Sequence, residues 1–430
     1  MSIGSDDRTS GSRTDRRLAW LVVAASTTVL AVLAAWLVPF DWVPGGRLGP
    51  PDAGEVFTPQ ELARADAYVR PVRYLSWTSL AVSLAVAGVL GLTPWGARLA
   101  RRWTAGRRWW VVSLVGTLAF CLTVRLVTLP FALAIRSRNL EAGLTNQGLL
   151  PWLWDRVLGL GLTFLVSALL VLLVVGSARR HPRRWFLAVG AGGVLLTFVA
   201  SFAYPLLVEP LFNRFTPLQD GPLRTSILRL ADEEGVDVDE VLVADASRRT
   251  TTLNAYVSGF WGTRRVVLYD TLVDDLPPDQ VRSVVAHELG HARHQDVVLG
   301  TGLASLGVLA GTGLLALLLD TRSVTRRAGV SGPADPAVAA LVLASLAWAT
   351  FLVSPAENTV SRAIEARADR AALTATNDPA SFVELQRSLA LRSLADATPP
   401  RWSQLWFGSH PTVLQRVGIA AAMSEERGTP

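Results

Sequence analysis

Seven apolar stretches, each about as long as a membrane-crossing helix, constrain the fold of this chain more than any other feature. A helix needs roughly 20 apolar residues to cross the hydrocarbon core of a bilayer. Half of the 430 residues are hydrophobic, only 18% are charged, and the mean hydropathy is +0.34, so a wholly soluble or largely disordered chain is excluded. The candidate spans lie at about 18–38, 74–93, 109–130, 157–176, 186–207, 297–319 and 337–354. The sequence therefore predicts a mainly α-helical, polytopic membrane bundle of about seven spans, surrounded by the lipid bilayer.

Polar segments divide the chain into three predicted parts. Residues 1–17 form a polar N-terminal tail, and residues 18–207 form a membrane domain of about five spans. Residues 208–425 form a second domain, which includes a two-span hairpin at about 297–354. Its long polar stretch has an α+β pattern, with a helix near 221–234, strands near 239–244, 251–258 and 264–269, and a helix from about 278 to 294.

The arginines indicate how the chain is oriented in the membrane. All 41 basic side chains are arginines, and many of them cluster in short connections between the apolar stretches, which favours membrane topology over a nucleic-acid partner. The N-terminus and the second, fourth and sixth connections are rich in arginine, and the first and third are poorer. The positive-inside rule then places the long fifth connection and the C-terminus outside the cell. The arginine-only composition is typical of a high-GC bacterium, so we expect a bacterial plasma membrane.

A histidine motif, HELGH at 287–291, lies on the last helix of the polar stretch. Residues four apart on a helix face the same way, so His287 and His291 can share one metal ion. Glu288 stands beside the ion rather than on it, where it can take a proton from a water that the ion activates. Zinc suits two neutral imidazoles and a carboxylate. The chain has only five histidines, which makes a chance match rare, and its single cysteine, Cys121, excludes a cysteine-rich site.

A catalytic zinc site needs a third protein ligand. The extended metzincin pattern is excluded, because Val297 stands where its third histidine is required. His294, three residues past His291, is one alternative, although a solvated or outer-sphere role suits it better.

The segment SRAIEARAD at 361–369 offers a better third ligand. On a helix it places Arg362, Glu365 and Asp369 on one face, a pattern that is usually a solvated salt-bridge stripe. Two membrane crossings separate this segment from the histidine motif, so the chain returns to the same side of the membrane. We therefore predict Glu365 as the third ligand.

Taken together, these motifs resemble peptidase family M48, specifically its Ste24-type branch, the CAAX prenyl proteases 1. The resemblance covers most of the chain from about residue 50, and its order and spacing around seven spans are far more specific than the histidine motif alone. The segments that carry it are FTPQELARADAYVRPVRY at 56–73, PLFNRFTPL at 210–218, NAYVSGF at 254–260, VVLYDTLV at 266–273, AHELGH at 286–291, SRAIEARAD at 361–369 and SHPTVLQRV at 409–417.

The resemblance implies an inserted zincin-like metalloprotease domain and a zinc-dependent membrane endopeptidase. Its substrates would be membrane-associated or lipidated proteins or peptides. One Zn²⁺ per chain would be bound by His287, His291 and Glu365, and Glu288 would be the general base.

The same resemblance implies roles for four further residues. Asp369 would orient a histidine or donate a proton, and Arg362 would hold Glu365 or Asp369. Asn254 would lie in the strand that lines the cleft and pairs with extended substrate. His410 would stabilise the oxyanion. Without the resemblance, Asn254 is read as a turn residue and His410 as a surface histidine.

Two other functions fit parts of the pattern. A membrane scaffold or quality-control binder could hold zinc without cutting, but the intact Glu288 and Glu365 argue against it. A transporter would show an internal repeat or paired broken helices, and the sequence shows neither.

Eukaryotic relatives cleave prenylated C-terminal tripeptides and hold the catalytic connection in the cytosol. In a bacterium such substrates are not expected to be common, and the arginine count predicts the outer face.

Overall fold

The computed structural model describes residues 14–259 and 264–426. Within this part, seven helices are long and apolar enough to cross a membrane, which confirms the predicted bundle. They are α1 (Arg16–Leu37), α3 (Pro59–Leu92), α5 (Trp109–Glu141), α6 (Leu149–Arg180), α7 (Trp185–Leu207), α11 (Asp296–Leu319) and α13 (Ala339–Thr376). Most of the predicted tail at 1–17, and the last residue of the 254–260 motif, lie outside the described residues.

Four of these helices are much longer than a membrane crossing requires. α3, α5, α6 and α13 contain 34, 33, 32 and 38 residues. At 1.5 Å per residue α13 is about 57 Å long, against roughly 30 Å for the hydrocarbon core. It runs without a break from the span predicted at 337–354 through the segment at 361–369, with Pro355 accommodated inside it. The seventh span and the segment that carries Glu365 are therefore one helix.

The polar stretch after α7 forms a four-stranded sheet with strand order β1-β2-β4-β3. The central strands β2 and β4 are parallel, and the edge strands β1 and β3 are antiparallel to their neighbours. The strands are β1 (Phe215–Pro217), β2 (Glu240–Ala244), β3 (Ala255–Ser258) and β4 (Arg265–Tyr269). The sequence prediction lacks β1, because three residues are too few to show alternation. It also begins β3 too early, since residues 251–254 are irregular.

Helices of this domain pack around the sheet and share its apolar core with α13. Two were predicted, and they are present as α8 (Pro222–Glu233) and α10 (Pro278–Arg293). The others are α9 (Asp270–Asp275), α14 (Pro379–Ser393), α15 (Arg401–Phe407) and α16 (Val413–Glu426), with short turns η1 (Glu209–Leu211) and η2 (Ala246–Arg248). The remaining short helices are α2 (Ala53–Val56), which packs against α14 and α16, and three in the membrane bundle, α4 (Pro94–Arg102), α12 (Arg322–Arg327) and η4 (Pro336–Val338).

The motif at 56–73 joins the third helix to the C-terminal part of the chain. Glu61 in the first turn of α3 forms an ion pair with Arg387 of α14. About three turns further along α3, Arg73 pairs with Asp396, just beyond α14. These contacts fix the position of the membrane helices relative to the sheet domain.

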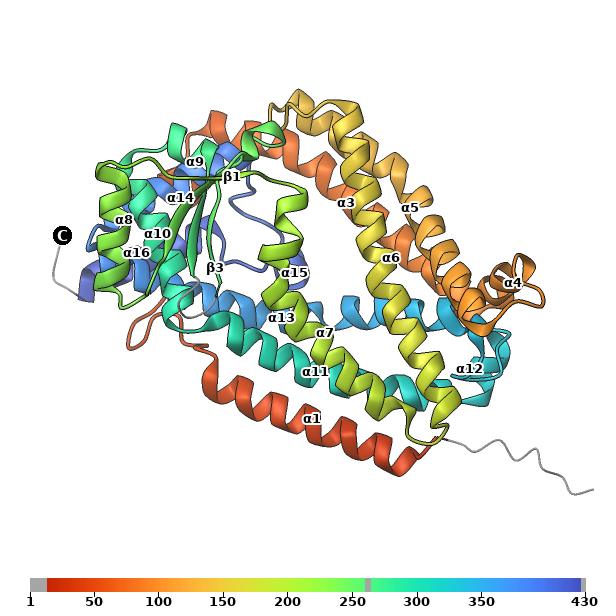
Figure 1. The fold of residues 1–430 in the computed structure, drawn as a ribbon. Helices are drawn as coiled ribbons and strands as arrows, with labels where there is room; N and C mark the ends of the chain where they lie inside the picture. Colours follow the sequence, from red (N-terminus) through yellow and green to blue (C-terminus); the bar gives the residue numbers. More distant parts are fainter. Residues whose placement is uncertain (1–13, 260–263, 427–430) are drawn as a thin grey trace, which may run out of the picture.

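The two ends of the molecule differ in charge. Figure 1 shows the sheet domain at one end of the bundle and α4 and α12 at the other. The connection between α6 and α7 lies beside the start of α1, because the N–H of Asp15 donates to the carbonyl of Arg183 at 2.9 Å. The arginine-rich second, fourth and sixth connections therefore gather at the end opposite the sheet.

Candidate metal centre

Close packing of α10 against α13 builds the site. Gly290, inside the histidine motif, faces Ala368 and Ala371 of α13. A Cβ at position 290 would lie 2.9 Å from the Cβ of Ala371, closer than real Cβ contacts allow. The missing side chain lets the two helices approach each other, and this approach carries Glu365 to the histidines of α10.

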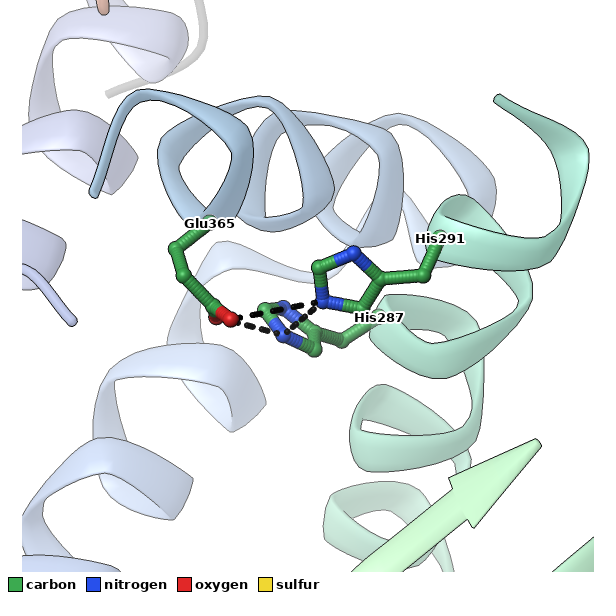
Figure 2. A group of neighbouring side chains, drawn as sticks. All are labelled: His287, His291 and Glu365. Carbon is green, nitrogen blue, oxygen red and sulfur yellow. Dashed lines mark hydrogen bonds and ion pairs between the residues drawn. The ribbon is translucent and has the colours of Figure 1, made fainter. Parts of the chain in front are cut away.

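His287, His291 and Glu365 turn their polar atoms toward one another (Figure 2), and one ligand-type atom from each lies within 4.8 Å of the others. The two Nε2 atoms are 3.2 Å apart. Oε2 of Glu365 lies 3.2 Å from Nε2 of His287, and Oε1 lies 3.7 Å from Nε2 of His291. The structure thus brings the three predicted ligands together, and in the described ranges it forms no second cluster of this kind.

Carboxylates fix the tautomers of both histidine rings. Nδ1 of His287 lies 3.0 Å from Oδ1 of Asp369, and Nδ1 of His291 lies 2.8 Å from Oδ2 of Asp296. A carboxylate accepts a hydrogen bond, so we assign the ring proton to each Nδ1 and a lone pair to each Nε2. The lone pairs on the two Nε2 atoms face each other beside the Glu365 carboxylate, and they repel unless a cation lies among them. In addition, Oε2 of Glu365 is buried without a hydrogen-bond partner. The donor atoms therefore fit a metal ion.

The surroundings of the histidines favour positive charge. Burial lowers the pKa of His291, but the hydrogen bond to Asp296 and the nearby carboxylate of Glu365 outweigh it and raise the pKa to about 10. Burial likewise opposes protonation of His287, and its pKa is still raised, through Asp369 and Glu365. A proton and a metal ion compete for the same lone pairs. Carboxylates that stabilise the protonated rings therefore also stabilise a bound cation.

Glu288 follows His287 on α10 and is half-buried. Burial raises the pKa of its carboxyl above the ordinary value, and the attraction of the neighbouring histidines only partly offsets this. A carboxylate with a raised pKa is a stronger base, which is the property that a general base requires.

Asp369 is completely buried, and Arg416 of α16 neutralises it. Nε of Arg416 donates to Oδ2 of Asp369 at 2.9 Å, and its Nη2 binds Oδ1. Burial lowers the pKa of Arg416, but Asp369 raises it overall, so the guanidinium stays charged. The sequence prediction did not single out Arg416, whose only signal is its place in the 409–417 motif.

Arg362 does not bind Glu365 or Asp369, contrary to the prediction. Its Nη1 donates to the backbone carbonyls of Gln404 at 3.0 Å and Gly408 at 2.6 Å. Both carboxylates already lie against histidines, and the guanidinium of Arg362 instead reaches backbone carbonyls where α15 ends. Arg362 therefore fixes the end of α15 rather than the carboxylates.

His410 lies in the segment that Arg362 fixes. The side-chain amide of Gln404 donates to the carbonyl of His410 at 2.7 Å. Nε2 of His410 lies 3.3 Å from Oε1 of Glu365, and 58% of the His410 side chain is exposed. The structure thus places this predicted residue at the open side of the metal cluster.

Two other predicted residues lie further out. Asn254 is exposed and directly precedes the edge strand β3, and its carbonyl accepts from the N–H of Tyr269 at 3.0 Å. The segment before it is tied to the membrane bundle, since Nε of Arg249 donates to Oδ2 of Asp155 in α6 at 3.0 Å. His294, the alternative ligand, turns back along its own helix, where its Nδ1 lies 2.8 Å from the carbonyl of Gly290.

Two family models match adjacent parts of the chain. Peptidase family M48 matches residues 217–424, and the model described as the CAAX prenyl protease N-terminal region with five membrane helices matches residues 47–214. The chain belongs to peptidase family M48. It is a multi-pass membrane metalloprotease that acts on peptide or protein substrates, as the sequence predicted.

Similar proteins come from bacteria and eukaryotes. A Bacillus subtilis (strain 168) protein described as an uncharacterized metalloprotease, YhfN, is 28% identical over 372 residues, which cover 85% of this chain and 87% of the relative. A CAAX prenyl protease 1 homolog of Oryza sativa subsp. japonica is 29% identical over 321 residues, with 71% and 73% covered. The crystal structure of S. mikatae Ste24p has the same fold, with a TM-score of 0.73 at 21% identity over 95% of this chain and all of that one.

Separating α10 from α13 should disperse the ligands. In Gly290→Val the side chain has no space against Ala371, and such overpacking costs roughly 1–3 kcal/mol. We expect a lower Tm and less bound metal per chain, measured by thermal unfolding and elemental analysis of the purified protein. Gly300→Ala on α11, where a Cβ would meet nothing within 4 Å, is the matched control. Full metal content in Gly290→Val would contradict the role given to this contact.

The link between Arg362 and His410 can be measured with a double-mutant cycle. Arg362→Gln releases the end of α15, and we expect cleavage of a peptide substrate to slow by about 10²-fold because His410 is misplaced, with the metal content unchanged. Because Arg362 acts through His410, adding Arg362→Gln to His410→Ala should cause little further loss. Independent, multiplicative losses would show that the two residues are not connected in this way.

Proposed function

We propose that this membrane metalloprotease is a zinc-dependent endopeptidase that cuts membrane-associated or lipidated proteins and peptides. The convergence of Nε2 of His287, Nε2 of His291 and the Glu365 carboxylate carries the proposal. Two neutral imidazoles and one carboxylate are a common donor set of catalytic zinc, and they leave a further coordination position for the reaction.

The chemistry follows from the groups around this cluster. When bound, the zinc ion supplies a Lewis acid that activates water and polarises the peptide carbonyl. Glu288 accepts the proton of the attacking water and passes it to the leaving amine. His410 stabilises the oxyanion that develops on the former carbonyl. Asp369, which Arg416 keeps charged, holds the ring of His287 in place throughout.

The edge strand β3 is the proposed binding site for an extended substrate backbone. β3 pairs with β4 on one side and packs near α10, the helix of the histidine motif. A strand with one unpaired edge binds extended peptides through main-chain hydrogen bonds. Asn254 stands at the start of this strand, where it can anchor one end of the peptide.

Two observations support a membrane-associated or lipidated substrate. The histidine helix is followed at once by the span α11, and Glu365 is carried by the helix of the seventh span, so the site stands where two spans leave the apolar region. Several relatives are named CAAX prenyl proteases, which suggests lipidated proteins as one substrate class.

We also propose that the catalytic site lies outside the cytoplasm, in the plasma membrane of a bacterium. The arginine-rich connections gather at the end of the bundle away from the sheet domain (Figure 1). Short positive connections remain in the cytoplasm, so this end would face inward and the sheet domain outward.

The role of Glu288 can be separated from metal binding. We expect Glu288→Ala to retain zinc, because the three ligands are unchanged, and to lose about 10²- to 10⁴-fold in cleavage of a membrane peptide library. Zinc would be measured by elemental analysis of the same samples. Asp220→Asn, which changes a carboxylate that is 94% exposed, is the control and should cleave normally.

Each alternative result excludes a different part of this proposal. Equal cleavage by the wild type and Glu288→Ala would remove Glu288 from the mechanism. A wild type that binds zinc and cuts nothing would favour a zinc-binding scaffold. A wild type without zinc would remove the zinc assignment.

Thiol labelling tests the sidedness. In a Cys121→Ser background, Arg102→Cys in α4 should react with an impermeant reagent only from the cytoplasmic side, and Arg264→Cys beside β4 only from outside. Intact cells and inverted membrane vesicles expose the two sides separately. Labelling of both positions from the same side would contradict the proposed topology.

A further inference from the structure

A second ion pair next to the metal cluster joins Asp296, the carboxylate on the ring of His291, to Arg367. Oδ2 of Asp296 lies 2.8 Å from Nδ1 of His291, and Oδ1 of the same carboxylate binds Nη2 of Arg367. The Asp296 side chain is 7% exposed and the Arg367 side chain 17%. This Arg367–Asp296–His291 chain parallels the Arg416–Asp369–His287 chain on the other ring.

The backbone explains why Asp296 reaches the ring. α10 ends at Arg293, and Gln295 adopts a left-handed conformation with φ of 55°. This break turns the chain, so that Asp296, the first residue of α11, directs its carboxylate back to the last turn of α10. Arg367 comes from α13, two residues after the ligand Glu365. Three helices thus meet at one carboxylate.

This carboxylate controls the ring of His291 in two respects. The carboxylate accepts the hydrogen bond from Nδ1–H, which fixes the tautomer in which the Nε2 lone pair points toward Glu365 and His287. The same hydrogen bond limits rotation of the ring. Arg367 holds the carboxylate itself and neutralises its buried charge. Without the carboxylate, the ring of His291 is free to turn and to adopt the other tautomer, and either change takes the Nε2 lone pair away from a metal ion.

We propose that Asp296, held by Arg367, is a positioning residue that sets the zinc affinity of the site through His291. The inference rests on the proposed zinc site. The competing explanation is an ion pair that only ties α11 to α13, without influence on the metal. Zinc affinity and folding stability distinguish the two, because a tie between helices changes stability alone.

Zinc dissociation constants of the full-length, detergent-solubilised protein provide the test, measured by competition with a chromophoric chelator. Removing an outer-sphere partner of a metal ligand typically weakens metal affinity by about 10- to 100-fold. We expect Asp296→Ala to raise the zinc dissociation constant by that amount. Asp296→Asn keeps an oxygen that can accept the Nδ1 proton, so it should retain part of the affinity and also provides a second variant if Asp296→Ala does not fold. Glu234→Ala removes an ion pair with Arg293 at the end of α10, away from the histidine rings, and should bind zinc like the wild type.

A charge exchange, Asp296→Arg with Arg367→Asp, sharpens the comparison. It restores opposite charges between α11 and α13 but leaves no carboxylate on Nδ1 of His291. In the metal-free state, we expect the charge-exchange variant to have a higher Tm than Asp296→Ala. Its zinc binding should stay weak. Recovery of zinc affinity by the exchange, or Asp296 variants that bind zinc within twofold of the wild type, would overturn the inference and leave a purely structural ion pair. Absence of zinc binding by the wild type would instead overturn the proposed function.

Discussion

The contact between α10 and α13 is the constraint on which the metal site depends. The histidine motif and Glu365 are far apart in the chain, and their donor atoms meet because Gly290 presents no side chain and α13 presents only alanines, Ala368 and Ala371, at that point. Interiors are packed closely enough that one extra methyl group at such a crossing displaces a helix. With the spacing fixed, Asp369 follows one turn after Glu365 and meets His287.

The close contact of α10 with α13 also buries several charged groups, which costs free energy. Removing a charged group from water costs several kcal/mol unless a partner compensates it, and a buried ion pair adds little net stability even then. Each buried aspartate of this site is therefore shared between a histidine ring and an arginine, in the pairs Asp369–Arg416 and Asp296–Arg367. What the molecule gains is orientation, because a ring bound at Nδ1 can present Nε2 in one direction only.

Sequence reasoning was sufficient wherever the structure is local. Hydropathy predicts all seven spans, and the spacing of the histidine motif predicts two rings on one face of a helix, because both patterns depend only on neighbours along the chain. Among contacts made in three dimensions, it predicted Glu365 beside the histidines but missed or misassigned several others. The break at Gln295 removes any helical spacing between Asp296 and His291, Arg416 arrives from the last helix, and Arg362 prefers carbonyls of α15 to the carboxylates on its own face.

The seventh span shows how a correct prediction can still misplace a boundary. Apolar composition ends near residue 354, but α13 continues through Pro355 to Thr376, across the alanine-rich and charged residues of the 361–369 segment, which favour a helix. Both helices of the hairpin therefore belong to the membrane and to the site, since α11 begins with Asp296 and α13 carries Glu365. Near its other end α13 is packed against Gly91 of α3, where a Cβ would overlap that of Ala344. A polar domain cut away from α11 and α13 would therefore lose Glu365, Asp369 and Asp296 together.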